Sequence, residues 1–495
     1  MVRFKMNTIL SFIVSAFILG SSCTEENKAV APPPPVVGPD NPENITVVVT
    51  TKSDVSNQKN VGLKTIEDAV SSGTEENIST LRIDQNQVYQ EMDGFGFTLT
   101  GGSAAHLMGM SQSKRTALLT ELFGTDSNEN QLGISFLRLS IAASDLDAKA
   151  FSYAMTKGSD DNLLSNFSIQ EDMKNLVPVL KEIIAIQPTI KFLSTPWSPP
   201  TWMKSNNSAI GGQLLVKYYE AYADYFIKYI DAYQKEGIDI YAITIQNEPL
   251  HPGNEPSMLM HANEMADFIA QQLGPKLKAA GITTKIITYD HNADKPEYPI
   301  EIIQSAANEF ISGSAFHLYG GDISALSQVK AADVSKDIYF TEQWVDSEDG
   351  DFGNTLMWHF ENIIIGSTRN WAKGVMEWNL TSNSSLTPRT PGGCTRCLGG
   401  LTVDADDVNR NVAYYIIGHA SKYVPVGSVR IKTNQLGNLP NVAFLTPEGK
   451  IVTLIMNNAE TGTKVNLNFK NTEESYTVSL PGNAVATIIH TKPMS

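Results

Sequence analysis

The chain has 495 residues, of which 37 are Lys or Arg and 53 are Asp or Glu, so its formal net charge is −16 at pH 7. This length allows a barrel of about 250 or more residues together with one accessory domain. Because phosphate binding needs concentrated positive charge and no basic cluster follows the first few residues, the composition argues against a nucleic-acid partner.

The amino terminus has the pattern of an export signal. Two basic residues precede an apolar run, residues 9–19, that is too short to span a bilayer. The run ends in small residues and Cys23, which resembles a bacterial lipobox, although Leu19 stands one position further from the cysteine than that pattern has it. We expect residues 1–22 to be a lipoprotein signal peptide. The alternative is an ordinary secretory signal with an incidental cysteine.

Residues 23–44 are proline-rich and lack apolar periodicity, which predicts an extended, semi-rigid tether. A tether after a lipidated Cys23 would hold a globular domain away from a membrane. We therefore expect an exported monomer that is lipid-anchored in a bacterial outer membrane, at its periplasmic face or at the cell surface. Its only contact with the membrane would be the anchor at Cys23.

Short apolar runs alternate with helical patterns across residues 91–419. Eight of these runs are candidate strands, the number that a closed parallel barrel needs. Their expected ends lie near Phe97, Leu139, Ser194, Ile245, Tyr289, His317, Thr341 and Trp378. Residues 215–227 predict an intervening helix, whose tyrosines we expect to pack in the interior. The predicted fold is α/β, a (β/α)8 TIM barrel.

Outside this span the apolar pattern changes to period two. Two runs precede the barrel and five follow it, and turn signals separate them. These candidate strands are residues 45–50, 80–83, 442–445, 451–456, 465–469, 476–480 and 485–489. We expect residues 45–90 and 420–495 to form one accessory β-sandwich, built from both ends of the chain.

Two glutamates follow candidate barrel strands at once. Glu248 lies in Gln246-Asn247-Glu248-Pro249, and Glu342 follows Thr341, 94 positions further on. A retaining glycosidase on such a barrel needs two carboxylates of this kind, an acid/base and a nucleophile, about 5 to 5.5 Å apart. A glutamate after a strand is also often only a solvated loop charge, so the pair carries more weight than either residue.

Polar and aromatic residues follow the other strands as well. Active-site residues of these barrels come from the carboxyl ends of the strands, so we expect a sugar-sized pocket with aromatic walls. The candidate substrate-binding residues are Arg138, Asp145, Trp197, Asn247, His317, Tyr319 and Trp378. For Arg138 a purely structural ion pair is an equal alternative, and for Trp202 core packing is the preferred interpretation.

Cys394 and Cys397 form a CxxC motif, which can be redox-active, half of a zinc site, or a short-loop disulfide. No second CxxC or paired histidine completes a zinc site, and an exported protein favours oxidation. We favour a structural disulfide that stiffens a loop.

Several segments between residues 90 and 430 resemble glycoside hydrolase family 30, which includes glucosylceramidases and endo-β-1,6-glucanases. They occur in matching order, and they are residues 136–140 with Asp145, 194–204, 246–249, 317–319, 341–342 and 377–379. The resemblance implies a (β/α)8 barrel with a β-sandwich fed by both chain ends. It also implies a retaining double displacement that needs neither metal nor organic cofactor, with Glu248 as acid/base and Glu342 as nucleophile.

The resemblance further implies how the sugar is held. Asn247 would hydrogen-bond the 2-hydroxyl, while Asp145 and Trp197 would hold the hydroxyls on the far side of the ring. Trp378 would form the floor of the pocket.

Two more residues would act on the catalytic carboxylates. Arg138 would pair with one of them and keep it ionised, and Tyr319 would orient Glu342. The mechanism asks for a raised pKa at Glu248 and a low pKa at Glu342.

The chain departs from the family pattern in two places. Members of the family often carry Thr-Asp where this chain has Thr100-Gly101, so any sugar contact of that aspartate is absent or supplied elsewhere. Glu377 stands where an aspartate or another residue can occur, which leaves its role open.

The loops at residues 251–256 and 391–398 most resemble the β-1,6-glucanase branch. We therefore expect an endo-β-1,6-glucanase acting on extracellular β-glucan, with a glucosylceramidase as the alternative. A non-catalytic carbohydrate-binding lipoprotein would be expected to lack one of the two carboxylates, and both are present. No Gly-x-Ser-x-Gly or His-Glu-x-x-His motif points to a serine hydrolase or a metalloenzyme.

Overall fold

The computed structural model describes residues 44–57, 62–126, 130–160, 162–348 and 351–491. The expected signal peptide, Cys23 and all of the expected tether except Asn44 lie outside these ranges. Among the helices of the described residues, none is both long and apolar enough to cross a membrane.

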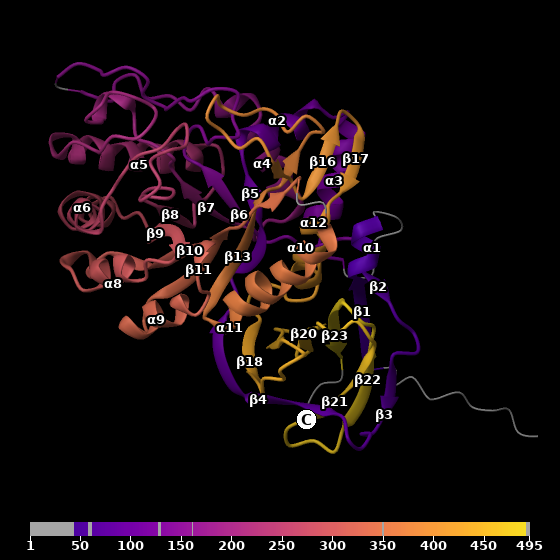
Figure 1. Cartoon of the computed structure of the whole chain (residues 1–495). Coiled ribbons are helices and arrows are strands. Elements are labelled where there is room, and N and C mark those ends of the chain that lie inside the picture. The colour runs from indigo at the N-terminus through magenta and orange to yellow at the C-terminus, as the bar shows by residue number, and fades with distance from the viewer. Residues whose placement is uncertain (1–43, 58–61, 127–129, 161, 349–350, 492–495) are drawn as a thin grey trace, which may run out of the picture. The chain divides into compact units, whose positions relative to one another are not determined.

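Eight parallel strands close into a barrel in the order β10-β11-β13-β5-β6-β7-β8-β9, which confirms the predicted fold (Figure 1). The expected strand ends fall within these strands or, for Ile245, at the next residue. The strands are β5 (Gly94–Leu99), β6 (Phe136–Ser140), β7 (Lys191–Thr195), β8 (Ala242–Thr244), β9 (Lys285–Ala293), β10 (Ile311–Gly321), β11 (Asp337–Glu342) and β13 (Ala372–Asn379).

Helices connect successive barrel strands, and a final helix, α12, follows the last strand. They are α2 (Gly101–Gly109), α3 (Gln112–Phe123), α4 (Leu176–Ile186), α5 (Tyr219–Lys235), α6 (Ala262–Phe268), α7 (Gly274–Ala279), α8 (Glu297–Ile303), α9 (Ala325–Ala332), α10 (Phe352–His359), α11 (Ser367–Arg369) and α12 (Val412–Ser421). Single π-helical segments, Ile269–Leu273 and Phe360–Gly366, join α6 to α7 and α10 to α11.

Helix α5 shows why the expected tyrosine-rich helix packs inward. Its five tyrosines, at positions 219, 222, 225, 229 and 233, are all buried. The hydroxyl of Tyr229 donates to Ser194 of β7 (2.9 Å), so the polar end of a buried ring is satisfied inside the barrel layer. The helix ends before Gly237, whose φ of +80° is the left-handed conformation common after a helix. The tyrosines therefore serve packing, as expected.

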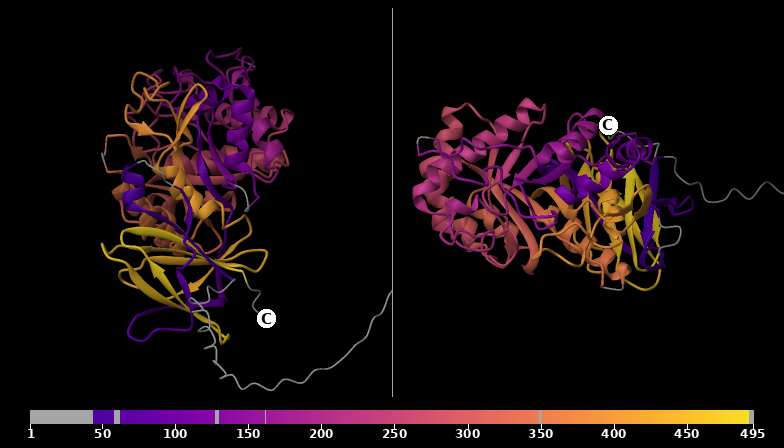
Figure 2. Two further views of the ribbon diagram at one scale, coloured as in Figure 1. Left: turned by 90° about the vertical axis from the view of Figure 1, so that its right-hand side faces the viewer. Right: turned by 90° about the horizontal axis from the view of Figure 1, so that it is seen from above.

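Both chain ends contribute strands to one ten-stranded sheet, in the order β2-β1-β23-β20-β19-β18-β4-β21-β22-β3. Figure 2 shows indigo and yellow segments side by side in both views. The strands are β1 (Ile45–Thr51), β2 (Lys64–Thr65), β3 (Val70–Ser72), β4 (Ser79–Glu91), β18 (Val429–Thr433), β19 (Asn441–Leu445), β20 (Ile451–Asn457), β21 (Thr463–Phe469), β22 (Ser475–Leu480) and β23 (Ala484–His490).

All seven expected strands are present in this sheet, while β2, β3 and β18 were not anticipated. Strand β4 ends at Glu91, and the first barrel strand begins three residues later at Gly94. The division of the chain at residues 90 and 420 stays a prediction.

Strand β1 is buried on both of its faces. Val47 and Val49 belong to the apolar core of the sandwich, whereas Val48 belongs to the core that includes the barrel. Because successive strand residues point to opposite faces, a continuous apolar run is what a strand between two cores requires. The sandwich and the barrel therefore share β1 as a common wall.

His419 of α12 links the barrel layer to this wall. The side chain is fully buried, with Nδ1 2.9 Å from the Thr487 hydroxyl of β23 and Nε2 3.0 Å from the Thr50 hydroxyl of β1. Burial lowers the pKa of His419 to about 3, so the ring is neutral in the folded protein at neutral pH.

Stability should therefore fall as the pH drops from about 6.5 towards about 3, because the unfolded chain protonates this histidine while the folded protein does not. In H419Q we expect that slope to be shallower by about 1.4 kcal/mol per pH unit. Urea denaturation of both proteins at several pH values measures the difference. Parallel stability curves for the two proteins would contradict a neutral buried His419.

Candidate active site

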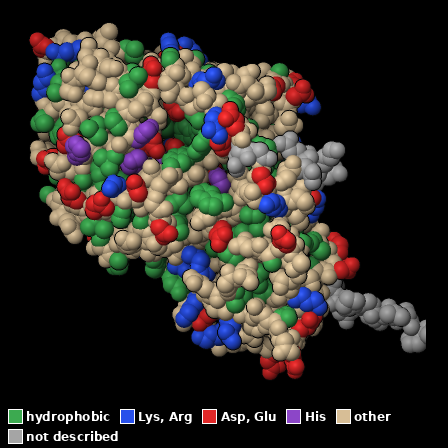
Figure 3. All heavy atoms as spheres, viewed as in Figure 1, with side chains coloured by type: hydrophobic (Ala, Val, Ile, Leu, Met, Phe, Trp, Pro, Cys, Tyr) green, Lys and Arg blue, Asp and Glu red, His purple; other side chains and the backbone are tan. Residues whose placement is uncertain are grey.

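A pocket of about 500 Å³ lies at the carboxyl ends of the barrel strands. Seven of the nine predicted site residues line it, and the other two, Arg138 and His317, are fully buried. Figure 3 shows one face of the molecule, on which histidine and acidic side chains border a hollow with hydrophobic walls. The structure thus brings together residues that the sequence separates by more than 230 positions.

Glu248 and Glu342 face each other in this pocket. A carboxylate oxygen of each and a ring nitrogen of His317 all lie within 4.8 Å of one another. Glu342 is the last residue of β11, and Glu248 follows β8 with a left-handed backbone, φ +46°. Such a conformation is uncommon for a residue with a side chain and is found where a site requires it. The spacing suits two carboxylates acting on one sugar carbon.

Arg138, on β6, lies beneath the two glutamates. Its guanidinium donates to Glu342 Oε2 (2.6 Å), Asn247 Oδ1 (2.6 Å) and Asp290 Oδ2 (2.9 Å). Burial lowers the pKa of Arg138, but Asp290 and Glu342 raise it by a larger amount. The net shift is upward, so the group stays charged. Arg138 is therefore both a buried ion pair and a direct contact of the proposed nucleophile, and the two interpretations offered by the sequence are compatible.

Asp290 is the central acceptor that the sequence interpretation missed. It receives bonds from Arg138, from His317 Nε2 (3.1 Å) and from the hydroxyls of Thr195 (3.1 Å), Thr244 (2.9 Å) and Thr341 (2.6 Å). Burial alone would raise its pKa, but Arg138 and His317 hold it well below the usual range.

A signal for Asp290 was present in the sequence. It follows Tyr289, near which strand β9 was expected to end, so the rule that selected Glu248 and Glu342 also applies to it. Both residues have left-handed backbones, with φ +75° at Tyr289 and +61° at Asp290.

His317 lies between the catalytic candidates and Asp290 and is fully buried. Its Nδ1 is 3.4 Å from Glu248 Oε1 and 3.9 Å from Glu342 Oε1. Burial lowers the pKa of His317, but Glu342, Asp290 and Glu248 raise it to about 9, so the imidazolium is the stable form at neutral pH. His317 therefore contacts carboxylates beneath the pocket rather than forming part of its lining.

Tyr319 and two tryptophans complete the inner pocket. The Tyr319 hydroxyl donates to Glu342 Oε1 (3.0 Å), the contact that the family resemblance implied. The rings of Trp197 and Trp378 lie 5.5 Å apart, and the Arg138 guanidinium is 4.8 Å from the Trp197 ring. Trp202 is instead packed against Tyr218, as expected.

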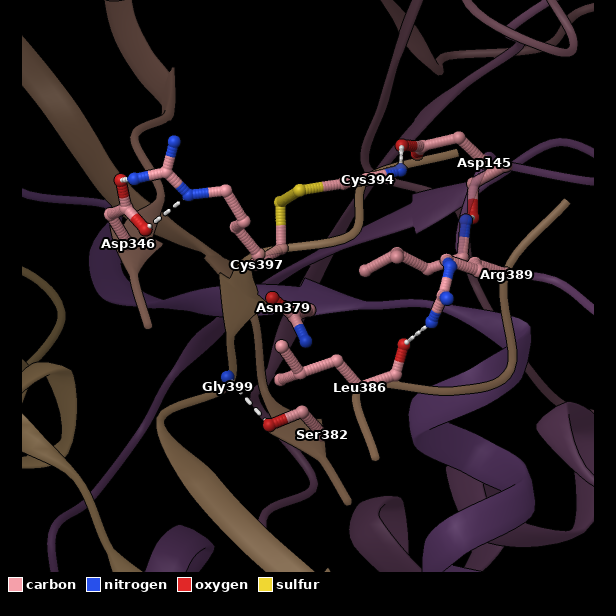
Figure 4. Close-up of a disulfide and its surroundings, with 12 residues drawn as sticks. Asp145, Asp346, Asn379, Ser382, Leu386, Arg389, Cys394, Cys397 and Gly399 are labelled. Atoms are coloured by element: carbon pink, nitrogen blue, oxygen red, sulfur yellow. Dashed lines mark hydrogen bonds and ion pairs between the residues drawn. A yellow bond between two sulfur atoms is a disulfide. The ribbon is translucent and has the colours of Figure 1, made fainter. Parts of the chain in front are cut away.

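Cys394 and Cys397 form the predicted disulfide, with an S–S distance of 2.08 Å. The backbone N–H of Cys394 donates to Asp145 Oδ2 (3.1 Å), as Figure 4 shows. Burial and the charge of Glu342 raise the pKa of Asp145 to about 7, while the bond from Cys394 opposes this rise. The disulfide loop therefore holds one of the predicted sugar-binding carboxylates.

The two departures from the family pattern have structural explanations. A Cβ atom added to Gly101 would lie only 1.9 Å from Asp147 Oδ1, so an aspartate at position 101 would require the Asp147 carboxylate to move. Glu377 is buried away from the pocket lining, where its Oε1 lies 2.8 Å from His359 Nδ1.

A metal ion could in principle be held by Glu248, His317 and Glu342, because one ligand atom of each lies within 4.8 Å of the others. The Arg138 guanidinium, 2.6 Å from Glu342, and the raised pKa of His317 both disfavour a cation at this position. The charges fit a network of ion pairs and protons better than a metal site.

Comparison with known proteins agrees with this geometry. The family model for the glycosyl hydrolase family 30 TIM-barrel domain matches residues 92–424, and that for the family 30 beta sandwich domain matches residues 427–488.

Two curated relatives and one solved structure show the range of the similarity. An endo-1,6-beta-D-glucanase of Neurospora crassa is 35% identical over 69% of this chain and 72% of its own length. The mouse lysosomal acid glucosylceramidase is 27% identical over 76% of this chain and 77% of its own. A solved endo-beta1,6-glucanase superimposes with a TM-score of 0.83 at 34% identity, covering 91% of this chain and 99% of that structure. The chain belongs to glycoside hydrolase family 30 and is an O-glycosyl hydrolase.

Proposed function

We propose that this enzyme is an endo-β-1,6-glucanase that cleaves extracellular β-glucan with retention of configuration. The observation that carries the chemistry is the facing pair Glu248 and Glu342, with carboxylate oxygens within 4.8 Å across one pocket. The substrate assignment is supported by the relatives named endo-1,6-beta-glucanase, which are more similar to this chain than the relatives named glucosylceramidase.

The reaction would proceed in two displacements. A Glu342 oxygen attacks the anomeric carbon, the bond to the leaving oxygen breaks, and Glu248 donates its proton to that oxygen. A glucosyl ester on Glu342 remains. Glu248, now ionised, takes a proton from water, and the resulting hydroxide attacks the same carbon and frees Glu342. Two inversions restore the original configuration.

Two hydrogen-bond donors beside Glu342 favour its ionised form. Arg138 and Tyr319 donate to different oxygens of this carboxylate, and both bonds are strongest while it is an anion. They thereby orient the nucleophile before attack, and they stabilise it again when the ester is hydrolysed.

The neighbouring polar side chains would hold the sugar. Asn247, whose amide oxygen is occupied by Arg138, presents its amino group to the 2-hydroxyl. Asp145, held by Cys394, and Trp197 would contact hydroxyls on the other side of the ring, above Trp378.

The pKa order in the sugar-free site is opposite to the order the mechanism requires. Burial raises the pKa of Glu248, but the hydrogen bond from His317 and the charges of His317, His291 and His251 lower it, and its net direction is down. Burial also raises the pKa of Glu342, and the charges of Glu248 and Asp290 raise it as well. His317 and Arg138 lower it by less than this sum, so its net direction is up.

The two glutamates titrate as a pair, because the charge of each acts on the other. Activity is lost as Glu248 deprotonates with rising pH and as Glu342 protonates with falling pH. We therefore expect a bell-shaped profile of kcat/KM with its maximum at acidic pH and low activity at neutral pH.

His317 has a testable part in setting this profile. In H317Q its positive charge no longer lowers the pKa of either glutamate, so both limbs of the profile should move up by about one pH unit or more. The matched control is H359Q, which changes another buried histidine that contacts a carboxylate outside the pocket. An H317Q profile that superimposes on the wild-type profile would contradict this role.

Product analysis tests the substrate. Purified enzyme is incubated with linear β-1,6-glucan and, separately, with a short-chain glucosylceramide. We expect gluco-oligosaccharides from the glucan and no glucose from the lipid. E248Q and E342Q should lower kcat/KM by about 10³-fold or more, because each removes a group that acts on the reacting atoms.

E377Q provides the matched carboxylate control for those variants, since Glu377 is buried outside the pocket. Glucose released only from the lipid would identify a glucosylceramidase instead. Binding to glucan without any turnover would favour a carbohydrate-binding lipoprotein, a reading that two well-placed carboxylates do not support.

We also propose that the chain is exported as a lipid-anchored monomer, with residues 1–22 as signal peptide and residues 23–44 as tether. The support is the order of an apolar run, small residues, Cys23 and a proline-rich segment.

Expression of the full chain in a Gram-negative bacterium with labelled palmitate tests this anchor. The wild-type chain should be labelled and should sediment with the outer membrane, whereas C23A should carry no label. A wild-type chain that is soluble and unlabelled after signal cleavage would show an ordinary secretory signal.

A further inference from the structure

The residues that line the pocket differ in depth. At its inner end Asp145, Trp197 and Asn247 are each less than a tenth exposed. At its mouth Trp344 and Arg396 are partly exposed. Beneath the inner end the barrel is closed by fully buried side chains, so a ligand longer than one sugar ring must extend towards the mouth.

Trp344 continues the aromatic wall outward. It packs against a cluster formed by Leu146, Trp197, Trp378 and Cys397, against which Cys394 also packs, so the disulfide and three tryptophans belong to one cluster. The backbone of Trp344 is fixed on both sides. The carbonyl of the preceding residue, Gln343, accepts from the backbone N–H of Trp378 (2.7 Å). The residues that follow form strand β12 (Val345–Asp346), which pairs with β15 (Cys397–Leu398).

The Arg396 guanidinium lies over the Trp344 ring, 6.0 Å from its centroid. Its charge is already balanced by Asp346, 2.9 Å from Nε, and by Glu348, 3.0 Å from the same nitrogen. Figure 4 shows the Asp346 contact beside the disulfide. Because two carboxylates surround one guanidinium, the mouth suits a neutral ligand better than a phosphate or another anion.

Arg396 keeps one donor group for such a ligand. Among the described residues, no acceptor contacts its Nη1, so this nitrogen can donate to a hydroxyl. An aromatic face bordered by a free donor is a suitable combination for a pyranose, which has apolar C–H faces and hydroxyl edges.

Two loops enclose the mouth. The Thr390 hydroxyl donates to the carbonyl of Glu255 (2.5 Å), which joins the loop after Glu248 to the loop that contains the disulfide. His251 and Asn254 of the first loop line the same pocket as Trp344. Because this loop directly follows Glu248, which protonates the leaving oxygen, we assign the mouth to the leaving group.

We propose that Trp344, together with Arg396, forms a second sugar-binding subsite that holds the first glucosyl unit of the leaving group. This inference rests on the proposed glucanase function. Stacking on Trp344 would orient the leaving oxygen towards Glu248, and the subsite would favour glucan chains over substrates whose leaving group is not a sugar.

The test compares two substrates that share the glucosyl unit of the inner site and differ in the leaving group. β-Glucosyl fluoride fills the inner site alone, because its leaving group is a single atom, whereas a β-1,6-linked gluco-oligosaccharide also fills the proposed subsite. In W344A we expect kcat/KM for the oligosaccharide to fall about 10- to 100-fold, with little change for the fluoride. W344F, which keeps an aromatic face, should recover part of the loss.

W358A is the matched control, since Trp358 is 42% exposed and does not line the pocket. Its kcat/KM should equal the wild-type value on both substrates. Equal losses on both substrates in W344A, or no loss on either, would overturn the subsite while the glucanase assignment stands. A wild-type enzyme that hydrolyses the fluoride but not the oligosaccharide would overturn both proposals.

Discussion

The buried guanidinium of Arg138 is the constraint around which the catalytic end of the barrel is arranged. Removing such a charge from water costs several kcal/mol, and only close, well-oriented partners offset that cost. Here Asp290 and Glu342 supply the opposite charges, and Asn247 adds an amide oxygen. Because these partners come from different strands, the ion pair can be complete only when the barrel is closed. Arg138, which positions Glu342, therefore has all of its partners only in the folded barrel.

Asp290 extends this constraint to the rest of the barrel. Its carboxylate receives hydroxyl groups from β7, β8 and β11, together with His317 of β10. The left-handed backbones of Tyr289, Asp290 and Glu248 occur beside this network. Such conformations persist where surrounding contacts determine them, and the number of donors around Asp290 is consistent with that role.

Much of this architecture could be predicted from the sequence because it depends on local patterns. Apolar runs at regular intervals located the eight barrel strands, and their polar end residues located Glu248 and Glu342. Asp290 was missed because no motif surrounds it, although its position after a strand was visible. Strand β18 was missed because its residues, Val429–Thr433, alternate charged and apolar side chains over only five positions.

The pKa order of the glutamates could not be predicted from strand patterns, because it depends on distances between side chains. Three histidines lower the pKa of Glu248, and they come from positions 251, 291 and 317 of the chain. Similarly, a side chain at position 101 would meet the carboxylate of Asp147, a contact that only the folded chain reveals. Long-range electrostatics and close packing are the parts of a site that a linear pattern does not contain.

The shared strand β1 has a consequence for how the molecule is made. Ile45 of β1 is paired with His490 of β23. The ribosome must therefore add all the residues between these two positions before the pair can form. Until β23 emerges, Val48 and Val49 cannot complete either of the cores between which they lie. Contacts of such large sequence separation form slowly because the intervening loop must close first. A nascent chain therefore carries its first strand unpaired on that side until its last strand arrives, and the final residues complete both parts of the molecule together.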